Sequence, residues 1–226
     1  MTATEFIQPE GRQTIASAIA AAEKQTSAEI VCAVASESGR YDREESIVGL
    51  LGAIAALILV NLTAAGDTTG AGSWTLAHSL TLTEQAAAVV VGFILGSMVA
   101  SRWPALRRLL SPSDTLAREC ARAAAVVFGQ RRLASTRSRS GLLIYVSLAE
   151  RRVVVLGDDC VTKAAGQALL DRLRDLAVDR LRAGRRVETF VDSIQAATQE
   201  LAVKMPPSPV NPDELPNELV CIHPRP

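Results

Sequence analysis

Three carboxylates are the side chains of this chain whose positions best suit joint chemistry. Glu29 stands at the start of one apolar run, and Asp158 and Asp159 follow the end of another. If the fold brings these ends to one edge, the three form an acidic cluster, and hard oxygen ligands of this kind suit Ca²⁺ or Mg²⁺. With a metal, such a cluster could orient a phosphate group. The alternative interpretation is that Asp158 caps the following helix and Glu29 is a solvated strand start.

A group of arginines is the second candidate for chemistry. Arg131, Arg132, Arg137 and Arg139 follow one another closely, but no aromatic side chains are interleaved with them, as a nucleic-acid interface would require. The chain also carries 24 Lys+Arg against 24 Asp+Glu, and this zero balance argues against a dedicated nucleic-acid binder. Two interpretations remain for Arg137 and Arg139: an intramolecular ion pair, or binding of a phosphate group.

Other site chemistries find little support in the sequence. Four scattered cysteines form no CxxC pair and indicate reduced thiols in a reducing compartment. They are Cys32, Cys120, Cys160 and Cys221. The two histidines do not supply the close ligand pairs of a zinc site. Dinucleotide-binding, P-loop, zincin and hydrolase-elbow motifs are all absent from the sequence.

Two long apolar stretches predict a transmembrane hairpin over residues 47–101. Residues 47–65 carry no charge and would form a helix about 28 Å long, close to the thickness of a bilayer core. The second span covers about 82–101, with Glu84 near its start, where a carboxylate can sit in the headgroup layer. A buried hairpin in a soluble protein is the alternative, but the rest of the chain is too short to enclose two such helices.

Arginines next to the spans predict their orientation. Arg40 and Arg43 precede the first span, whereas Arg102, Arg107 and Arg108 follow the second, and the connection between the spans has no Lys or Arg. Basic residues favour the cytoplasmic side. We therefore expect a multi-pass protein of the bacterial inner membrane with both termini in the cytoplasm.

The remaining segments predict one α/β domain that the hairpin interrupts. The strands are expected at 29–35, 142–148 and 152–156, and the helices at 14–26, 113–133, 163–183 and 187–203. One strand cannot be a stable domain alone, so segment 1–46 should share a small mixed sheet with segment 102–205. The end of the chain, 206–226, holds seven prolines and is expected to be a tail or strap without a compact element.

The predicted order of elements also defines two edges of the sheet. A crossover connection makes strands 29–35 and 142–148 parallel, so Glu29 and Gly141 share one edge. The next strand returns to that edge and brings Asp158 and Asp159 with it. At the opposite edge, the turn over residues 150–152 is expected near anionic lipid headgroups.

Three motifs give the chain a family resemblance over nearly its whole length. TRSRSGLLIYVSLAERRVVVLGDD (Thr136–Asp159), SAEIVCAVA (Ser27–Ala35) and ELPNELV (Glu214–Val220) resemble the TPM-domain family, in particular the bacterial membrane proteins whose domain is interrupted by two transmembrane helices. The chain departs from the family pattern in three ways: the glycine usual after the aspartate is Asp159 or Cys160, a tryptophan of the next helix is absent, and Thr189 replaces another glycine.

The resemblance implies a TPM-like fold and a choice of functions. Other branches of the family are associated with calcium binding, acid phosphatase activity and maintenance of membrane protein complexes. The match of Arg137 and Arg139 to the family pattern favours an intramolecular ion pair for them. We therefore expect an integral membrane protein whose cytoplasmic domain is an interaction or assembly module, with the lipid bilayer and another membrane protein as partners. The alternative is a phosphatase that depends on Ca²⁺ or Mg²⁺ and hydrolyses phosphomonoesters as acid phosphatases do.

Overall fold

The chain forms two units in a computed structural model that describes residues 2–66, 80–131, 133, 140–207 and 216–226. The globular unit combines Met1–Gly39 with Asp114–Pro226, and the helical unit is Arg40–Ser113. The globular unit is thus built from segments on both sides of the helical one, as the sequence predicts.

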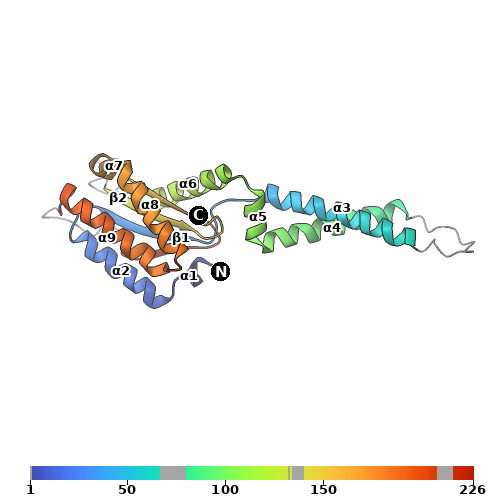
Figure 1. Cartoon of the computed structure of the whole chain (residues 1–226), viewed down its shortest axis with the longest axis horizontal. Helices are drawn as coiled ribbons and strands as arrows, with labels where there is room; N and C mark the ends of the chain where they lie inside the picture. Colours follow the sequence, from blue (N-terminus) through green and yellow to red (C-terminus); the bar gives the residue numbers. More distant parts are fainter. Residues whose placement is uncertain (1, 67–79, 132, 134–139, 208–215) are drawn as a thin grey trace, which may run out of the picture. The chain divides into compact units, whose positions relative to one another are not determined.

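A four-stranded sheet forms the centre of the globular unit (Figure 1). Its strands are β1 (Glu29–Ala35), β2 (Gly141–Ser147), β3 (Arg152–Gly157) and β4 (Leu219–Ile222). They lie in the order β3-β2-β1-β4. Strand β1 pairs in parallel with both β2 and β4, and β2 pairs in antiparallel with β3. The predicted parallel pairing is confirmed, and its register places Glu29 opposite Gly141.

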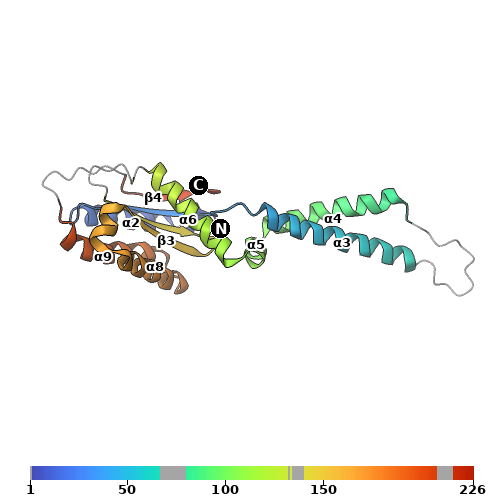
Figure 2. The same cartoon turned by 90° about the horizontal axis from the view of Figure 1, so that it is seen from above.

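Helices cover both faces of the sheet, which explains why β1 and β2 are apolar throughout. Successive side chains of a strand point to opposite faces. On one face, Ile30 and Ile144 belong to a core with helices α2 (Pro9–Glu23), α8 (Gln167–Arg182) and α9 (Arg186–Lys204). On the other face, Val31 and Tyr145 pack against α6 (Ser113–Gln130). Figure 2 shows α6 on one side of the sheet and α8 and α9 on the other.

The helices differ from the sequence prediction at their ends. Helix α2 begins at Pro9 rather than near residue 14, because proline suits the first turn of a helix. The single helix predicted over 163–183 is two helices, α7 (Asp159–Ala165) and α8, which meet at Gly166. That residue has φ of 79°, a backbone conformation that favours glycine. The short helix α1 (Ala3–Phe6) was not predicted.

The prediction that the proline-rich end contains no compact element was wrong. Strand β4 forms there and pairs with β1 over Cys32–Ala35. The four residues of β4 contain no proline, so every one of them keeps its backbone N–H for pairing. The high proline content of the surrounding segment concealed this short apolar run.

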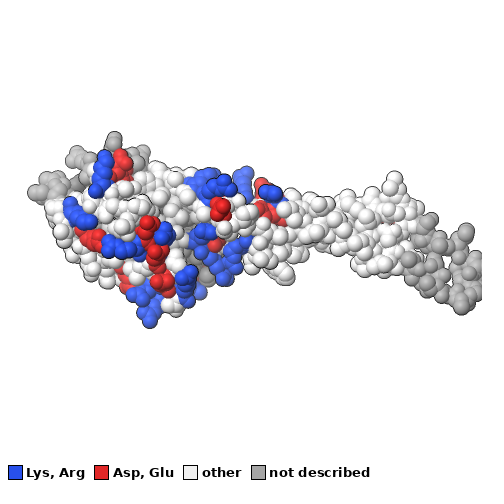
Figure 3. All heavy atoms as spheres, turned by 45° about the horizontal axis from the view of Figure 1, so that its top comes forward, with Lys and Arg blue, Asp and Glu red and all other residues white. Residues whose placement is uncertain are grey.

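The helical unit consists of two long apolar helices and a short one. They are α3 (Asp42–Gly66), α4 (Leu82–Arg102) and α5 (Pro104–Leu110). Both α3 and α4 are long and apolar enough to cross a membrane, and only 11% and 6% of their apolar windows are buried within the protein. The visible face of this pair is uncharged over most of its length (Figure 3). A core helix of a soluble protein would instead be mostly buried.

One of the arginines used to predict orientation forms contacts within the helical unit. The Arg107 guanidinium lies 3.3 Å from a carboxylate oxygen of Glu45, and it lies over the Tyr41 ring at 5.8 Å from the centroid. These contacts connect α5 to the first turn of α3. The Arg107 charge is therefore partly balanced by a protein carboxylate.

Small residues let α3 and α4 approach closely, and enlarging them is expected to separate the two helices. A Cβ atom at Gly52 would lie 2.4 Å from the Gly92 carbonyl oxygen, and a Cβ at Gly92 would lie 2.5 Å from that of Gly52. Gly92→Leu should therefore destabilise the pair by about 2–3 kcal/mol, because backbone atoms cannot move aside as a side chain can.

The measurement for Gly92→Leu is unfolding of the full chain in mixed detergent micelles, followed by circular dichroism. Ala87→Leu is the matched control, because it adds the same side chain at an exposed position of α4. Equal midpoints for the two variants would show that close packing at Gly92 does not stabilise the pair.

Candidate functional site

The structure places the three predicted carboxylates at one edge of the sheet. Glu29 is the first residue of β1 and faces Gly141 of β2. Asp158 follows β3, and its backbone N–H donates to the Gly141 carbonyl at 2.8 Å. Asp159 is the next residue and begins α7. The edge predicted from parallel pairing is therefore present.

The alternative interpretation, a helix cap at Asp158 and a solvated strand start at Glu29, is correct for Asp158 only. Asp158 is the N-cap of α7, and its Oδ1 accepts a hydrogen bond from the Asp159 backbone N–H at 2.8 Å. This confirms the capping role. Glu29 is only 5% exposed, so its interpretation as a solvated strand start was wrong. Burial follows from the position of β1 in the middle of a sheet that is covered on both faces.

Glu23 is a further buried carboxylate near this edge that the sequence analysis missed. It is 8% exposed at the end of α2, and its Oε1 accepts the Ile30 backbone N–H at 3.3 Å. Burial, with a smaller contribution from the Glu23 charge, raises the pKa of the Cys32 thiol. The helical stripe of α2 gave no signal for Glu23, because a glutamate in a last turn is normally solvated.

The described residues do not assemble these carboxylates into a metal centre. Across those parts of the chain, no three Asp, Glu, His or Cys side chains gather closely enough to hold an ion. The predicted phosphate-binding residues, Arg137 and Arg139, lie outside the described residues. Glu29, Asp158 and Asp159 thus lie at the same edge of the sheet, but their described positions do not form a set of metal ligands.

A buried polar network lies at the opposite end of β1 and β2. The Ser38 hydroxyl is 2.8 Å from the Tyr145 hydroxyl and donates to the Ser147 hydroxyl at 2.6 Å. Glu150 Oε1 accepts the backbone N–H groups of Ser38 at 2.9 Å and Gly39 at 3.2 Å, and its Oε2 accepts from the Ser147 hydroxyl. This carboxylate therefore ties the β2–β3 turn to the segment that leaves β1.

Glu150, in the turn over residues 150–152, is buried although charged turn residues are normally solvated. The expectation that this turn lies near lipid headgroups stays a prediction, but within the turn Glu150 is only 4% exposed and its carboxylate accepts hydrogen bonds inside the protein. Sequence reasoning treated a charged turn residue as solvated. The signal that could have revealed the network is the polar residues at the carboxyl ends of neighbouring parallel strands, where open α/β sheets commonly place their sites.

The network holds the fold together without presenting a reactive group. Tyr145 is fully buried, and burial raises the pKa of its phenol. Cys120 on α6 is also fully buried, and burial raises the pKa of its thiol to about 11. A thiol reacts through its thiolate, so Cys120 lacks the activation of a catalytic nucleophile.

The native protein is expected to protect Cys120 from alkylation. Burial raises the pKa of the Cys120 thiol from 9.0 to about 11, so the fold favours the protonated thiol. At pH 8 its thiolate fraction should therefore be about 100-fold lower than that of an unperturbed thiol. Treatment with iodoacetamide and peptide mass spectrometry should show the partly exposed Cys160 alkylated first. Rapid alkylation of Cys120 in folded protein would contradict its placement.

Comparisons with known proteins give one structural likeness. No protein-family profile and no curated protein sequence matches the chain. Among solved structures, the chain resembles the NMR structure of the BA42 protein from the psychrophilic bacterium Bizionia argentinensis. The TM-score is 0.54 at 19% sequence identity, and the alignment covers 95% of this chain and 94% of that chain. The chain is thus similar in fold, over nearly the whole length of both proteins, to a bacterial protein.

Proposed function

We propose that this chain is a TPM-type protein of the bacterial inner membrane whose α/β unit is a cytoplasmic interaction and assembly module for membrane proteins. One observation carries the proposal: two potential membrane spans are inserted between β1 and β2, which are adjacent strands of one sheet. The globular unit is therefore tethered through two chain connections, after Gly39 and before Asp114.

A double tether suits a module that works at a membrane surface. One linker lets a domain explore a large volume, whereas two linkers to the same hairpin restrict both its distance and its rotation. Such restriction raises the effective concentration of the module for partners in the same membrane. Basic residues next to the spans support a cytoplasmic position for the module.

The family resemblance adds to this proposal. The longest resembling run, Thr136–Asp159, includes β2, β3 and the turn held by Glu150. Proteins of the resembling family include factors that maintain membrane complexes, and an assembly role for this chain follows that precedent. The fold likeness to BA42 agrees with a bacterial origin for the architecture.

The experiment for this function is affinity purification of the full chain from detergent-solubilised bacterial membranes. We expect one integral membrane protein to be retained at a fixed stoichiometry. The Glu150→Ala variant should lose it, because the substitution disturbs the globular unit and leaves the helical unit unchanged. A chain that retains no membrane protein at fixed stoichiometry, or that retains it equally in both forms, would contradict the proposal.

A metal-dependent phosphatase is the second candidate, and one feature of Asp158 favours it. Its Oδ2 is buried and accepts no hydrogen bond from the described residues. A carboxylate oxygen that coordinates a cation would be left in this state when the cation is absent. Against this, Asp158 already caps α7 through its other oxygen. Glu29, Asp158 and Asp159 would be the metal ligands of this candidate, with Ca²⁺ or Mg²⁺ as the ion.

Hydrolysis of p-nitrophenyl phosphate by the detergent-purified chain separates the two candidates. The assembly module predicts no hydrolysis with either Ca²⁺ or Mg²⁺. A phosphatase predicts hydrolysis that Asp158→Asn removes, while the fold survives because asparagine caps a helix as well as aspartate does. Asp175→Asn, at an exposed carboxylate of α8 outside the candidate ligand set, is the control for a general loss of one negative charge.

A further inference from the structure

Helix α5 turns a basic side toward the protein and an apolar side away from it. At about 100° per residue, Arg107 and Arg108 fall on one face of the helix. The opposite face consists of Ala105, Leu106, Leu109 and Leu110. The Arg107 guanidinium lies 3.3 Å from a carboxylate oxygen of Glu45, so the basic face is turned toward the start of α3. On the other face, Leu109 is 81% exposed.

This arrangement is the reverse of that in a surface helix of a soluble protein. Such a helix buries its apolar stripe and shows its charged face to water. Directly before α5, Trp103 is 65% exposed, and it is the only residue between the end of α4 at Arg102 and the start of α5 at Pro104. The exposed apolar face is therefore fixed at the end of a potential membrane span, where hydrocarbon meets headgroups.

Two arginines beside this apolar face have no partner within the described parts of the chain. Neither the Arg102 nor the Arg108 guanidinium makes an ion pair or a hydrogen bond there, whereas that of Arg107 does. Arg102 is exposed and Arg108 is partly exposed. Their charges are thus available to an anion from outside the protein.

The start of α3 adds further charge at the same end of the helical unit. Arg40 and Arg43 are exposed there, as is Asp42, and Glu44 is buried. The contact between α5 and Glu45 places these residues at the same end as Arg102 and Arg108. When the paired Arg107 and Glu45 are set aside, four arginines outweigh two carboxylates, and the end of the hairpin is basic.

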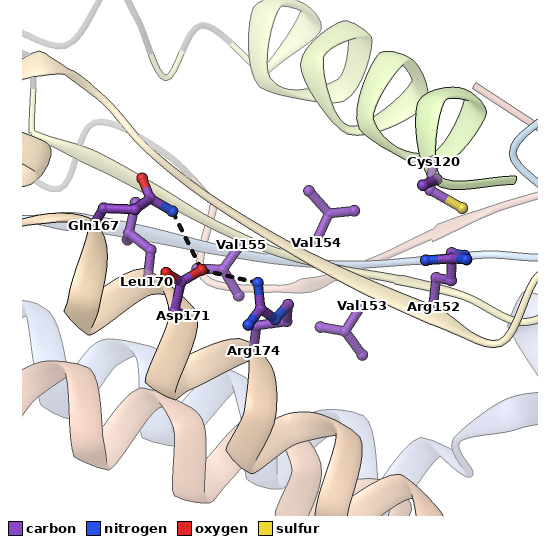
Figure 4. A pocket seen from close by; sticks show the side chains of 10 residues that line it. Cys120, Arg152, Val153, Val154, Val155, Gln167, Leu170, Asp171 and Arg174 are labelled. Atoms are coloured by element: carbon purple, nitrogen blue, oxygen red, sulfur yellow. Dashed lines mark hydrogen bonds and ion pairs between the residues drawn. The ribbon is translucent and has the colours of Figure 1, made fainter. Parts of the chain in front are cut away.

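The arginines of α8 differ, because each of them already pairs with a carboxylate. The four are Arg172, Arg174, Arg180 and Arg182. Arg174 lines a groove beside β3, with a volume of about 210 Å³ between α6 and α8, and Figure 4 shows it directed toward Asp171. It lies 2.8 Å from Asp171 and 2.9 Å from Asp175. An anion would have to displace these carboxylates, which it need not do at Arg102 and Arg108.

We propose that α5 and the adjoining end of α4 bind acidic phospholipids. Trp103, Leu109 and Leu110 enter the boundary between headgroups and acyl chains. Arg102 and Arg108 contact the headgroup phosphates, whose oxygens match the planar guanidinium. The inference rests on the membrane position in the proposed function and names the lipid class that this end of the hairpin selects.

A phospholipid fits both halves of the surface at once. Its acyl chain covers the exposed leucines and its headgroup neutralises the nearby arginines, so one molecule supplies the apolar and the anionic contact side by side. The net positive charge favours acidic over zwitterionic headgroups, because basic groups near an anionic bilayer surface are attracted to it. A protein that covered only the apolar face would leave both arginines without a partner.

The test is quenching of tryptophan fluorescence in nanodiscs by lipids with brominated acyl chains, which quench on contact. The chain has two tryptophans, so Trp74→Phe leaves Trp103 as the only reporter. At equal mole fractions, brominated phosphatidylglycerol should quench Trp103 more strongly than brominated phosphatidylcholine. We expect an apparent preference of at least about fivefold, the effect of about 1 kcal/mol for one basic group at an anionic surface.

Charge variants test the role of the two arginines. Arg102→Gln combined with Arg108→Gln should remove the preference and leave quenching by phosphatidylcholine unchanged, because the spans and the leucines remain. Arg182→Gln is the matched control, since it removes an exposed arginine of α8 outside the site. The preference should also fall as the NaCl concentration rises, because salt screens exposed charges. A preference that the double variant keeps would refute the site.

A second reporter tests the position of α5 itself. Leu109→Trp, in a chain whose two natural tryptophans are replaced by phenylalanine, should be quenched by brominated lipid because its face lies at the acyl boundary. Quenching of Trp103 without quenching of Leu109→Trp would place the apolar face of α5 in water or against protein, and would overturn the proposal.

Inorganic phosphate separates a lipid headgroup from a free anion as the ligand of the arginines. Replacement of chloride by phosphate at equal ionic strength should leave the preference for phosphatidylglycerol unchanged. Loss of the preference in phosphate would assign Arg102 and Arg108 to a free anion and contradict the lipid site.

Failure of this inference is distinguishable from failure of the proposed function. Equal quenching of Trp103 by the two lipids would refute selection of acidic phospholipids, while the membrane position and the assembly function would stand. Absence of quenching by either lipid would instead place the end of α4 outside the bilayer and contradict the membrane position itself.

Discussion

Deletion of residues 1–39 is expected to abolish folding of the globular unit rather than to weaken it. The deleted segment contains β1, which is hydrogen-bonded on both sides and separates β2 from β4. All seven residues of β1 are buried. The deletion also removes α2, whose Ile15 and Ile19 are fully buried in the core beneath the sheet. No remaining strand can bridge the gap, because β2 and β4 have no pairing with each other.

Deletion of residues 206–226 is the matched comparison for this experiment. It removes β4, an end strand whose loss leaves β1, β2 and β3 together. The buried apolar side chains lost with it are Leu219 and Val220. We expect a folded protein that is about 3 kcal/mol less stable. Circular dichroism and thermal unfolding of the full-length parent and both deletions in detergent provide the measurement. A cooperative transition of the globular unit in protein lacking residues 1–39 would disprove the split sheet.

Replacement of Glu150 by alanine is expected to have the next largest effect. Its carboxylate accepts hydrogen bonds from the Ser38 N–H, the Gly39 N–H and the Ser147 hydroxyl. The carboxylate and its three donors are buried inside the protein. Removal of the carboxylate leaves three donors without their acceptor in a site that water does not easily reach. We expect a loss of about 3–5 kcal/mol, as for the breaking of other buried charged networks.

Two other substitutions test this explanation of Glu150. Glu150→Gln keeps one acceptor oxygen for the backbone N–H groups but loses the second acceptor for Ser147, so its loss should be smaller than that of Glu150→Ala. Glu119→Ala removes a partly exposed surface carboxylate that pairs with Arg122 on α6 and should change stability by less than about 1 kcal/mol. Equal losses in denaturant unfolding for Glu150→Ala and Glu119→Ala would contradict the network.

The sequence was sufficient for the parts of the fold that depend on apolar patterning. Strands β1 and β2 are buried on both faces, so they appear as continuous apolar runs, and the parallel register between Glu29 and Gly141 follows from the helical crossover. The inserted hairpin was also recognisable, because two long apolar stretches of spanning length are rare in a small soluble domain.

Features that depend on distant contacts were not accessible in this way. Glu150 and Glu29 are buried by segments far away in the sequence, and nothing in their local sequence distinguishes them from solvated glutamates. Strand β4 depends on pairing with β1, which lies almost 190 residues earlier in the chain, on the side of β1 that β2 does not occupy. The break at Gly166 was overlooked because the apolar pattern continues on both sides of it.

The candidate site was predictable in location but not in detail. Parallel pairing was enough to bring Glu29 and Asp158 to one edge, since strand direction alone determines it. Whether carboxylates converge on one point depends on side-chain positions that no periodicity encodes. The groove beside β3 is likewise a product of how α6 and α8 pack, and no motif in the sequence marks it.

The most direct test of the membrane-anchored account is cysteine labelling with an impermeant maleimide in spheroplasts. The account predicts that Ser73→Cys, in the connection between the spans, reacts from outside. Asp179→Cys, at an exposed position of α8, should react only after the membrane is opened. Labelling of Asp179→Cys from outside with protection of Ser73→Cys would reverse the topology, and labelling of both in intact spheroplasts would contradict a membrane-spanning hairpin.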